Sequence, residues 1–211
     1  MALDTGDTDL PARFFGAWER SALTLDGEAV ADAGRAVWVQ AATFFVDVRG
    51  PGGFASDTCF AGTTKWSEPY LAWTHVIDRA GPEEGADAVE GEDRGHITFD
   101  GDDLIEEGSF IAGAERAYAE RWTRLAGPLT PVLAAASPGG LSVRVGDHAA
   151  AVVDRRATGG AFVAAYWRRG DSEWRLELDV DGDVASLPPP LEPGAALTDG
   201  WHWQTGAEVP A

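Results

Sequence analysis

Short runs of apolar residues, separated by Gly, Pro and Asp, recur about every ten residues along the chain, and long amphipathic helices are scarce. The clearest run is 174–180, where four apolar residues alternate with three charged ones. Alternation of this kind predicts a strand with one face in a core and one in water. Residues 161–167 precede it across a loop containing Gly170 and Asp171, so we expect the two segments to pair as an antiparallel hairpin.

The same pattern predicts most of the remaining strands. Residues 36–49 would span about 46 Å at roughly 3.3 Å per residue, so a bend or bulge is expected near residues 40–42. Further strands are expected at 14–25, 71–78, 96–99, 104–110, 141–145, 149–155 and around 201–204. Their short connections favour a meander closed on itself, because closure removes sheet edges that would otherwise aggregate.

Three other segments differ from this pattern. Residues 114–125 fit both a helical face and strand alternation, and both interpretations stay open. The acidic segment 83–93 carries six acids and little that could pack, which predicts a solvated, mobile loop. Prolines at 128 and 131 mark a break near the middle of the chain, and residues 186–190 form a stiff connector.

The amino-acid composition argues against several classes of function. The 16 basic and 35 acidic residues give a formal net charge of −19, which argues against a nucleic-acid clamp or a polybasic membrane surface. No uncharged apolar stretch approaches the roughly 20 residues of a membrane-spanning helix. A single cysteine, Cys59, excludes an intramolecular disulfide, and the first residues lack a signal-peptide pattern. We therefore expect a cytoplasmic protein of one large or two small domains.

Arginine accounts for nearly all the basic residues, with Lys65 as the only lysine. Two explanations stay open for this bias and for the acidic surface. One is a GC-rich genome. The other is a high-salt cytoplasm, where salt screens the self-repulsion of an acidic protein.

Short blocks along the chain carry a family resemblance. Residues 16–18 (GAW) are similar to the Gly-x-Trp entry of lipocalins and other calycins, in which the Trp plugs one barrel end. Further blocks follow in order at 60–63, 73–78, 101–108, 118–122, 141–145, 166–167, 184–188 and 200–203. Together they make the chain resemble the fungal Hri-one family and its bacterial relatives over nearly all of residues 13–205.

The resemblance implies an all-β protein with two lipocalin-like antiparallel barrels in tandem and little helix, in a family without an established activity. The implied organisation is a flexible N-terminus at 1–12, a first barrel at 13–127, and a second barrel or half-barrel at 128–211. The chain is shorter than the fungal proteins and the acidic segment is its own, so the kinase and translocon partners of those proteins are not carried over.

Nine tryptophans supply large apolar walls, each with an N–H that needs a partner when buried. In a calycin-like barrel they form core and end plugs, or they line a ligand cavity. The four predicted to line the first barrel are Trp18, Trp38, Trp73 and Trp122. We expect a non-catalytic protein that binds a small hydrophobic or aromatic ligand, or else a protein partner.

Two adjacent carboxylates are candidates for chemistry inside that barrel. Neighbouring residues on a strand point to opposite faces, so at most one of Glu106 and Glu107 enters the interior. A carboxyl held there would have a raised pKa, which suits anchoring a cationic group or moving a proton. Arg121, beside Trp122, could neutralise it in a buried pair. A surface or structural glutamate is the simpler interpretation.

The alternative function is therefore an acid/base isomerase, cyclase or hydratase that acts on a small hydrophobic metabolite. It would use Glu106 or Glu107 together with His75 or an arginine.

The histidines do not indicate a zinc site, because none has a second His or a Cys at ligand spacing. His202, between Trp201 and Trp203, offers one further alternative. A lone imidazole in an aromatic wall can hold haem, as the nitrobindin barrels do through a single histidine late in the chain. A turn or rim histidine is the simpler interpretation, and no cofactor is expected.

Overall fold

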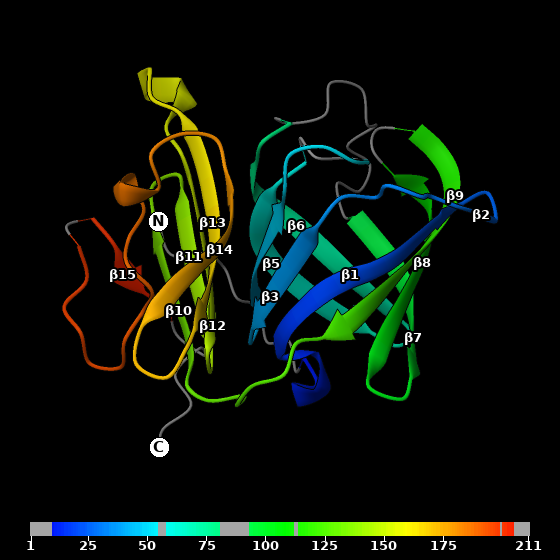
Figure 1. Cartoon of the computed structure of the whole chain (residues 1–211), viewed down its shortest axis with the longest axis horizontal. Coiled ribbons are helices and arrows are strands. Elements are labelled where there is room, and N and C mark those ends of the chain that lie inside the picture. The colour runs from blue at the N-terminus through cyan, green and yellow to red at the C-terminus, as the bar shows by residue number, and fades with distance from the viewer. Residues whose placement is uncertain (1–9, 55–57, 81–92, 112–113, 199, 205–211) are drawn as a thin grey trace.

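The computed structural model describes residues 10–54, 58–80, 93–111, 114–198 and 200–204, and it is built almost entirely of antiparallel strands (Figure 1). The first sheet contains β1 (Gly16–Leu25), β2 (Glu28–Ala29), β3 (Ala36–Ala41), β4 (Phe44–Arg49), β5 (Phe60–Ser67), β6 (Tyr70–Asp78), β7 (Asp93–Asp100), β8 (Asp103–Ile111) and β9 (Ala114–Arg124). The second contains β10 (Val132–Ser137), β11 (Gly140–Val145), β12 (His148–Asp154), β13 (Phe162–Arg169), β14 (Trp174–Val180) and β15 (His202–Trp203). The expected all-β class is confirmed.

The described helices are single 3-10 turns: η1 (Ala12–Phe14), η2 (Arg156–Thr158) and η3 (Val184–Ser186). Nowhere in the described ranges is a helix long and apolar enough to cross a bilayer.

The first sheet is a closed barrel of eight strands. Neighbouring strands pair antiparallel in the order β1-β3-β4-β5-β6-β7-β8-β9, and β9 returns to pair with β1. The two-residue β2 only extends one end of β1. Because the sheet closes, its strands have no free edge along the barrel wall. The prediction of a closed meander is confirmed for this half of the chain.

The second sheet does not close, so the predicted second barrel is wrong. Its strands follow the order β14-β13-β12-β11-β10-β15 and end at two separate edges. One face lies on the outside of the first barrel, over β3 and β4 (Figure 1). Leu187, Leu191 and Trp201, from the segment that follows β14, cover the other face. Both faces are buried by other parts of the chain, so the sheet does not need to curl around its own interior.

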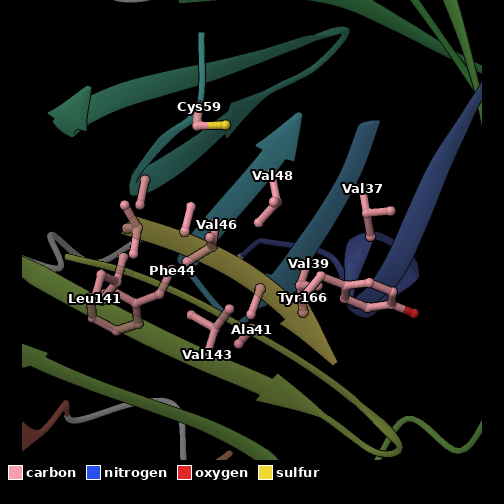
Figure 2. Close-up of a cluster of buried hydrophobic side chains, with 14 of the residues drawn as sticks. Val37, Val39, Ala41, Phe44, Val46, Val48, Cys59, Leu141, Val143 and Tyr166 are labelled. Carbon is pink, nitrogen blue, oxygen red and sulfur yellow. The ribbon is translucent and has the colours of Figure 1, made fainter. Parts of the chain in front are cut away.

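The core between the two sheets explains the continuous apolar runs of the sequence. Figure 2 shows Phe44 and Val46 of the barrel wall toward Leu141 and Val143 of the second sheet, and Val37 and Val39 beside Tyr166. All residues of β3, β4 and β11 are buried, and so are most residues of β10 and β12. Strands buried on both faces carry apolar residues at nearly every position, without the alternation of half-exposed strands.

This double burial also explains one error of the sequence analysis. The expected bend within 36–49 is a complete reversal of the chain: β3 ends at Ala41, β4 begins at Phe44, and these two residues pair. Ala42 takes the left-handed backbone conformation, with φ 53°. The turn contains no Gly, Pro, Asn or Asp, so no ordinary turn signal interrupts the apolar run.

The structure also settles the conformation of 114–124 and the orientation of the side chains in β14. Residues 114–124 form a strand, in which Tyr118 and Trp122 face the barrel interior. In β14 the expected single core face is wrong, because a bulge in its pairing with β13 places Leu176 opposite Trp167 but Leu178 opposite Tyr166. Leu176 is thereby turned to the other face of this edge strand and is 46% exposed. The acidic segment 83–93, apart from its last residue, lies outside the described residues.

Candidate functional site

Four strands of the barrel each direct a tryptophan into its interior, and these residues form a tryptophan cluster (Trp18, Trp38, Trp73 and Trp122). The ring of Trp38 lies 6.0 Å from that of Trp18 and 5.9 Å from each of the other two. The Trp18 indole N–H donates to the carbonyl oxygen of Phe14 at 2.9 Å, and that of Trp38 donates to Gln40 Oε1 at 3.0 Å. All four tryptophans therefore lie inside the first barrel and pack against one another as part of its core, and their role in lining a ligand site stays a prediction.

The turn η1 closes the barrel end next to this cluster. Phe14 is fully buried there, and its ring lies 4.9 Å from that of Trp66 and 5.5 Å from that of Phe99. Arg13 covers the outside of this plug, with its guanidinium 4.4 Å over the Phe99 ring.

Further from the plug, the inward-facing positions become polar, and these residues form a polar layer (Arg20, Asp47, Arg49, His75, Glu106, Tyr118 and Glu120). Residues two apart on a strand share a face, so Arg20 follows Trp18 into the interior and Glu120 precedes Trp122. Arg20 Nη1 donates to Glu120 Oε1 at 2.7 Å, and both side chains are almost fully buried. Arg49 donates twice to the Asp47 carboxylate, at 3.1 and 3.2 Å.

Glu106 is the third carboxyl of the layer, and it is 6% exposed. Its Oε1 accepts from the Tyr118 hydroxyl at 2.7 Å, and its Oε2 accepts from the Trp122 indole N–H at 3.1 Å. It lies directly opposite Glu120 in the pairing of β8 with β9. Burial, with repulsion from Glu120 and Asp93, raises the pKa of Glu106 well above its usual value. Glu106 therefore keeps its proton at pH values where an ordinary glutamate is ionised.

Two glycines give Glu106 and Tyr118 their space. A Cβ on Gly95 would lie 2.6 Å from Glu106 Cγ, and one on Gly108 would lie 2.4 Å from a carbon of the Tyr118 ring. Glycine inside a strand often marks such a close approach. These two glycines were a signal for the buried carboxyl that the sequence analysis missed.

His75 also lies inside the barrel, with its ring stacked 4.1 Å from the Phe60 ring. Its Nδ1 is 2.9 Å from Asp78 Oδ2, and its Nε2 is 3.6 Å from Asp93 Oδ2. Although burial disfavours the charged ring, the interactions with Asp78 and Asp93 raise the pKa of His75 to about 9. The imidazole is therefore cationic at neutral pH and is poorly suited to act as a general base.

Arg121 does not neutralise Glu106, so that expected pair is wrong. Since Trp122 points inward, the preceding residue points outward, and Arg121 binds Asp100 and Asp103 at 2.8 and 2.7 Å on the outer wall. The buried arginine that pairs with a carboxylate on this part of the barrel is Arg20, which the sequence analysis missed. Its position two residues after Trp18 was the available signal.

Glu107 lies on the outer wall, as strand alternation requires once Glu106 is inside. It is exposed and borders a shallow hollow of about 440 Å³ that is also lined by Tyr70, Arg94 and His96. The two adjacent glutamates therefore cannot act on one substrate. Of the two, only Glu106 remains a candidate for the barrel interior.

The remaining candidates lie away from the barrel interior. His202 is exposed on the edge strand β15, while Trp201 and Trp203 pack against Leu191. An exposed imidazole at a sheet edge lacks the apolar walls that enclose a haem. Burial raises the pKa of the Cys59 thiol to about 12, which makes it unreactive. Within the described residues, no three His, Cys, Asp or Glu side chains gather as metal ligands.

These observations define the class of protein: an antiparallel eight-stranded β-barrel with a tryptophan cluster and a buried polar layer inside, and an open six-stranded sheet packed on its wall. Residues 19–209 match the family model described as Protein HRI1. The chain belongs to the HRI1 family, as the sequence resemblance indicated. Comparisons with curated proteins and with solved structures found no match.

Proposed function

We propose that this protein is a non-catalytic small-molecule-binding protein, and that its ligand binds at the polar layer of a lipocalin-like barrel, next to the tryptophan cluster. The observation that carries the proposal is Glu106, a buried carboxyl that forms no ion pair with any described residue. Burying an ionisable group without a counter-charge costs several kcal/mol.

A second feature supports the same position. Arg20 is 7% exposed, and its buried Nε–H has no hydrogen-bond partner in the described part of the chain. The same holds for His75 Nε2, which lies beyond hydrogen-bond distance of Asp93. Buried polar atoms of this kind are normally completed by a water or a ligand. The polar layer thus offers both a carboxyl and an unused donor to a bound molecule.

The acid/base alternative is less well supported by the same residues. The raised pKa of Glu106 is compatible with proton transfer, but its expected partner His75 has a pKa raised to about 9. His75 therefore carries its proton at neutral pH and is not available as the general base. The arrangement favours binding over catalysis.

The test is a thermal-shift screen of a small-molecule library, followed by calorimetric titration of each hit against the wild type, Glu106→Gln and Glu107→Gln. Glu107→Gln is the matched control, because it makes the same chemical change one residue along β8 on the outer wall. We expect Glu107→Gln to bind as the wild type does, and Glu106→Gln to bind about tenfold more weakly or worse. A hit that binds all three proteins equally, or the absence of any hit, contradicts the proposal.

A further inference from the structure

The charges in and beside the polar layer do not balance when every carboxyl there is ionised, because Asp78 and Asp93 flank the one remaining cation of the layer, His75. Arg20 neutralises Glu120 at 2.7 Å, and Arg49 neutralises Asp47 at 3.1 Å. Glu106 is then left without a cation. Ionised, it would place a second negative charge directly across from Glu120 in a medium of low dielectric constant.

The groups that face Glu106 come from four other strands. Glu120 and Tyr118 lie on β9, Asp93 on β7 and Arg49 on β4, while Arg20 on β1 reaches this region through its contact with Glu120. Arg20 and Arg49 are each paired with a carboxylate, so neither supplies a free positive charge. His75 on β6 is paired with Asp78 and lies near Asp93. With Asp78 and Asp93 included, every cation near the layer already has a carboxylate partner, and an ionised Glu106 has none of its own.

We propose that the ligand of the polar layer is a small organic monocation with an oxygen acceptor, such as an amino alcohol, and that it replaces the proton of Glu106. This inference rests on the binding function proposed above. In the exchange, the O–H bond of the Glu106 carboxyl breaks and the proton passes to solvent, while the ammonium group forms an ion pair with the carboxylate. No covalent bond forms to the ligand. The oxygen of the ligand accepts a hydrogen bond from the Nε–H of Arg20, which has no partner among the described residues.

The aromatic surroundings favour the same class of ligand. The Trp122 indole is hydrogen-bonded to Glu106, and its ring lies 5.9 Å from that of Trp38. In the same layer, the Arg49 guanidinium already lies 5.0 Å over the Phe60 ring. Aromatic faces attract cations, and more strongly when the cation is desolvated. A monocation entering beside Glu106 meets a carboxylate and aromatic rings together.

Burial and the nearby carboxylates raise the pKa of Glu106, so the exchange depends on pH. Below that pKa, each unit by which the pH rises makes proton release from Glu106 easier, and the apparent affinity for the cation increases about tenfold. A neutral ligand of the same shape releases no proton and shows no such dependence.

The experiment uses two cations and their neutral carbon isosteres: choline with 3,3-dimethylbutan-1-ol, and ethanolammonium with propan-1-ol. Each is titrated calorimetrically into the wild-type protein at pH 6 and pH 7, in buffers of different ionisation enthalpy. We expect the cations to bind about tenfold more tightly than the isosteres or better, with release of about one proton per bound cation. Glu107→Gln should behave as the wild type does, and Glu106→Gln should lose both the preference and the proton release.

The outcomes separate the two proposals. If the isosteres or neutral library hits bind in a Glu106-dependent way while the cations do not, the inference fails and the binding function stands. If no molecule binds at the barrel, the function proposed above fails as well. Cation binding without proton release, or with its preference intact in Glu106→Gln, also overturns the inference. Should Glu106→Gln fail to fold by circular dichroism, the proton count on the wild type decides.

Discussion

Replacing Glu106 by glutamine should change how the stability of the protein depends on pH. In the folded protein the Glu106 carboxyl is buried and opposite Glu120, whereas in the unfolded chain it titrates near its ordinary value of 4.5. Glutamine is its uncharged isostere. The amide oxygen can accept from the Trp122 indole N–H and the amide nitrogen can donate to the Tyr118 hydroxyl, so both neighbours keep a partner.

The direction follows from the raised pKa. Above pH 4.5 the unfolded state loses the Glu106 proton while the folded state keeps it, so the wild type becomes less stable as pH rises. The slope is about 1.4 kcal/mol per pH unit until the folded-state pKa is reached. Glu106→Gln lacks this slope. The variant should therefore gain stability on the wild type as the pH rises above 4.5, by at most about 1.4 kcal/mol per pH unit.

The assay is urea unfolding at half-unit pH intervals from 4.5 to 6.5, followed by tryptophan fluorescence. Both the wild type and Glu106→Gln retain His75, so any contribution of His75 cancels in the difference between the two curves. Glu107→Gln is the control, and its curve should run parallel to that of the wild type because Glu107 is exposed in the folded protein. If Glu106→Gln also runs parallel to the wild type, the carboxyl is already ionised in the folded state and the reasoning is refuted.

Three further predictions concern the same interior. Between pH 6.5 and 9 the wild type should lose about 3 kcal/mol as the stabilising charge of His75 is titrated, and urea unfolding of His75→Gln should lack this loss; equal slopes would contradict it. Arg20→Ala should cost about 3–5 kcal/mol by leaving Glu120 unpaired, and Arg20→Met with Glu120→Leu should recover most of it in a double-mutant cycle; no recovery would argue against a buried pair. Gly95→Ala should cost about 1–3 kcal/mol by its contact with Glu106 Cγ, and thermal unfolding should show the loss reduced when Glu106→Ala is added.

The interior of the barrel was largely predictable because it depends on local alternation. Trp122 points inward in a two-residue pattern, and the same pattern sends Arg121 outward and lets only one of Glu106 and Glu107 inside. What the sequence analysis missed in this region was the identity of the cation. Arg20 and Glu120 are 100 residues apart in the chain, and they meet only because β9 closes on β1.

Local patterns in the sequence were enough to predict the all-β class, to place the tryptophans in the first barrel, and to exclude that both adjacent glutamates enter it. Each of these follows from the two-residue period of a strand, which a short segment carries completely. Contacts made only on folding settled that Glu106 is the inner glutamate and that 114–124 is a strand. They also settled that the second sheet stays open, that 36–49 reverses at Ala42, and which arginine meets which carboxylate. An apolar run is equally well buried inside its own barrel or against a neighbouring sheet, and the position of a charged residue in the sequence does not specify its ion-pair partner. Those outcomes depend on contacts between distant segments, which no local pattern contains.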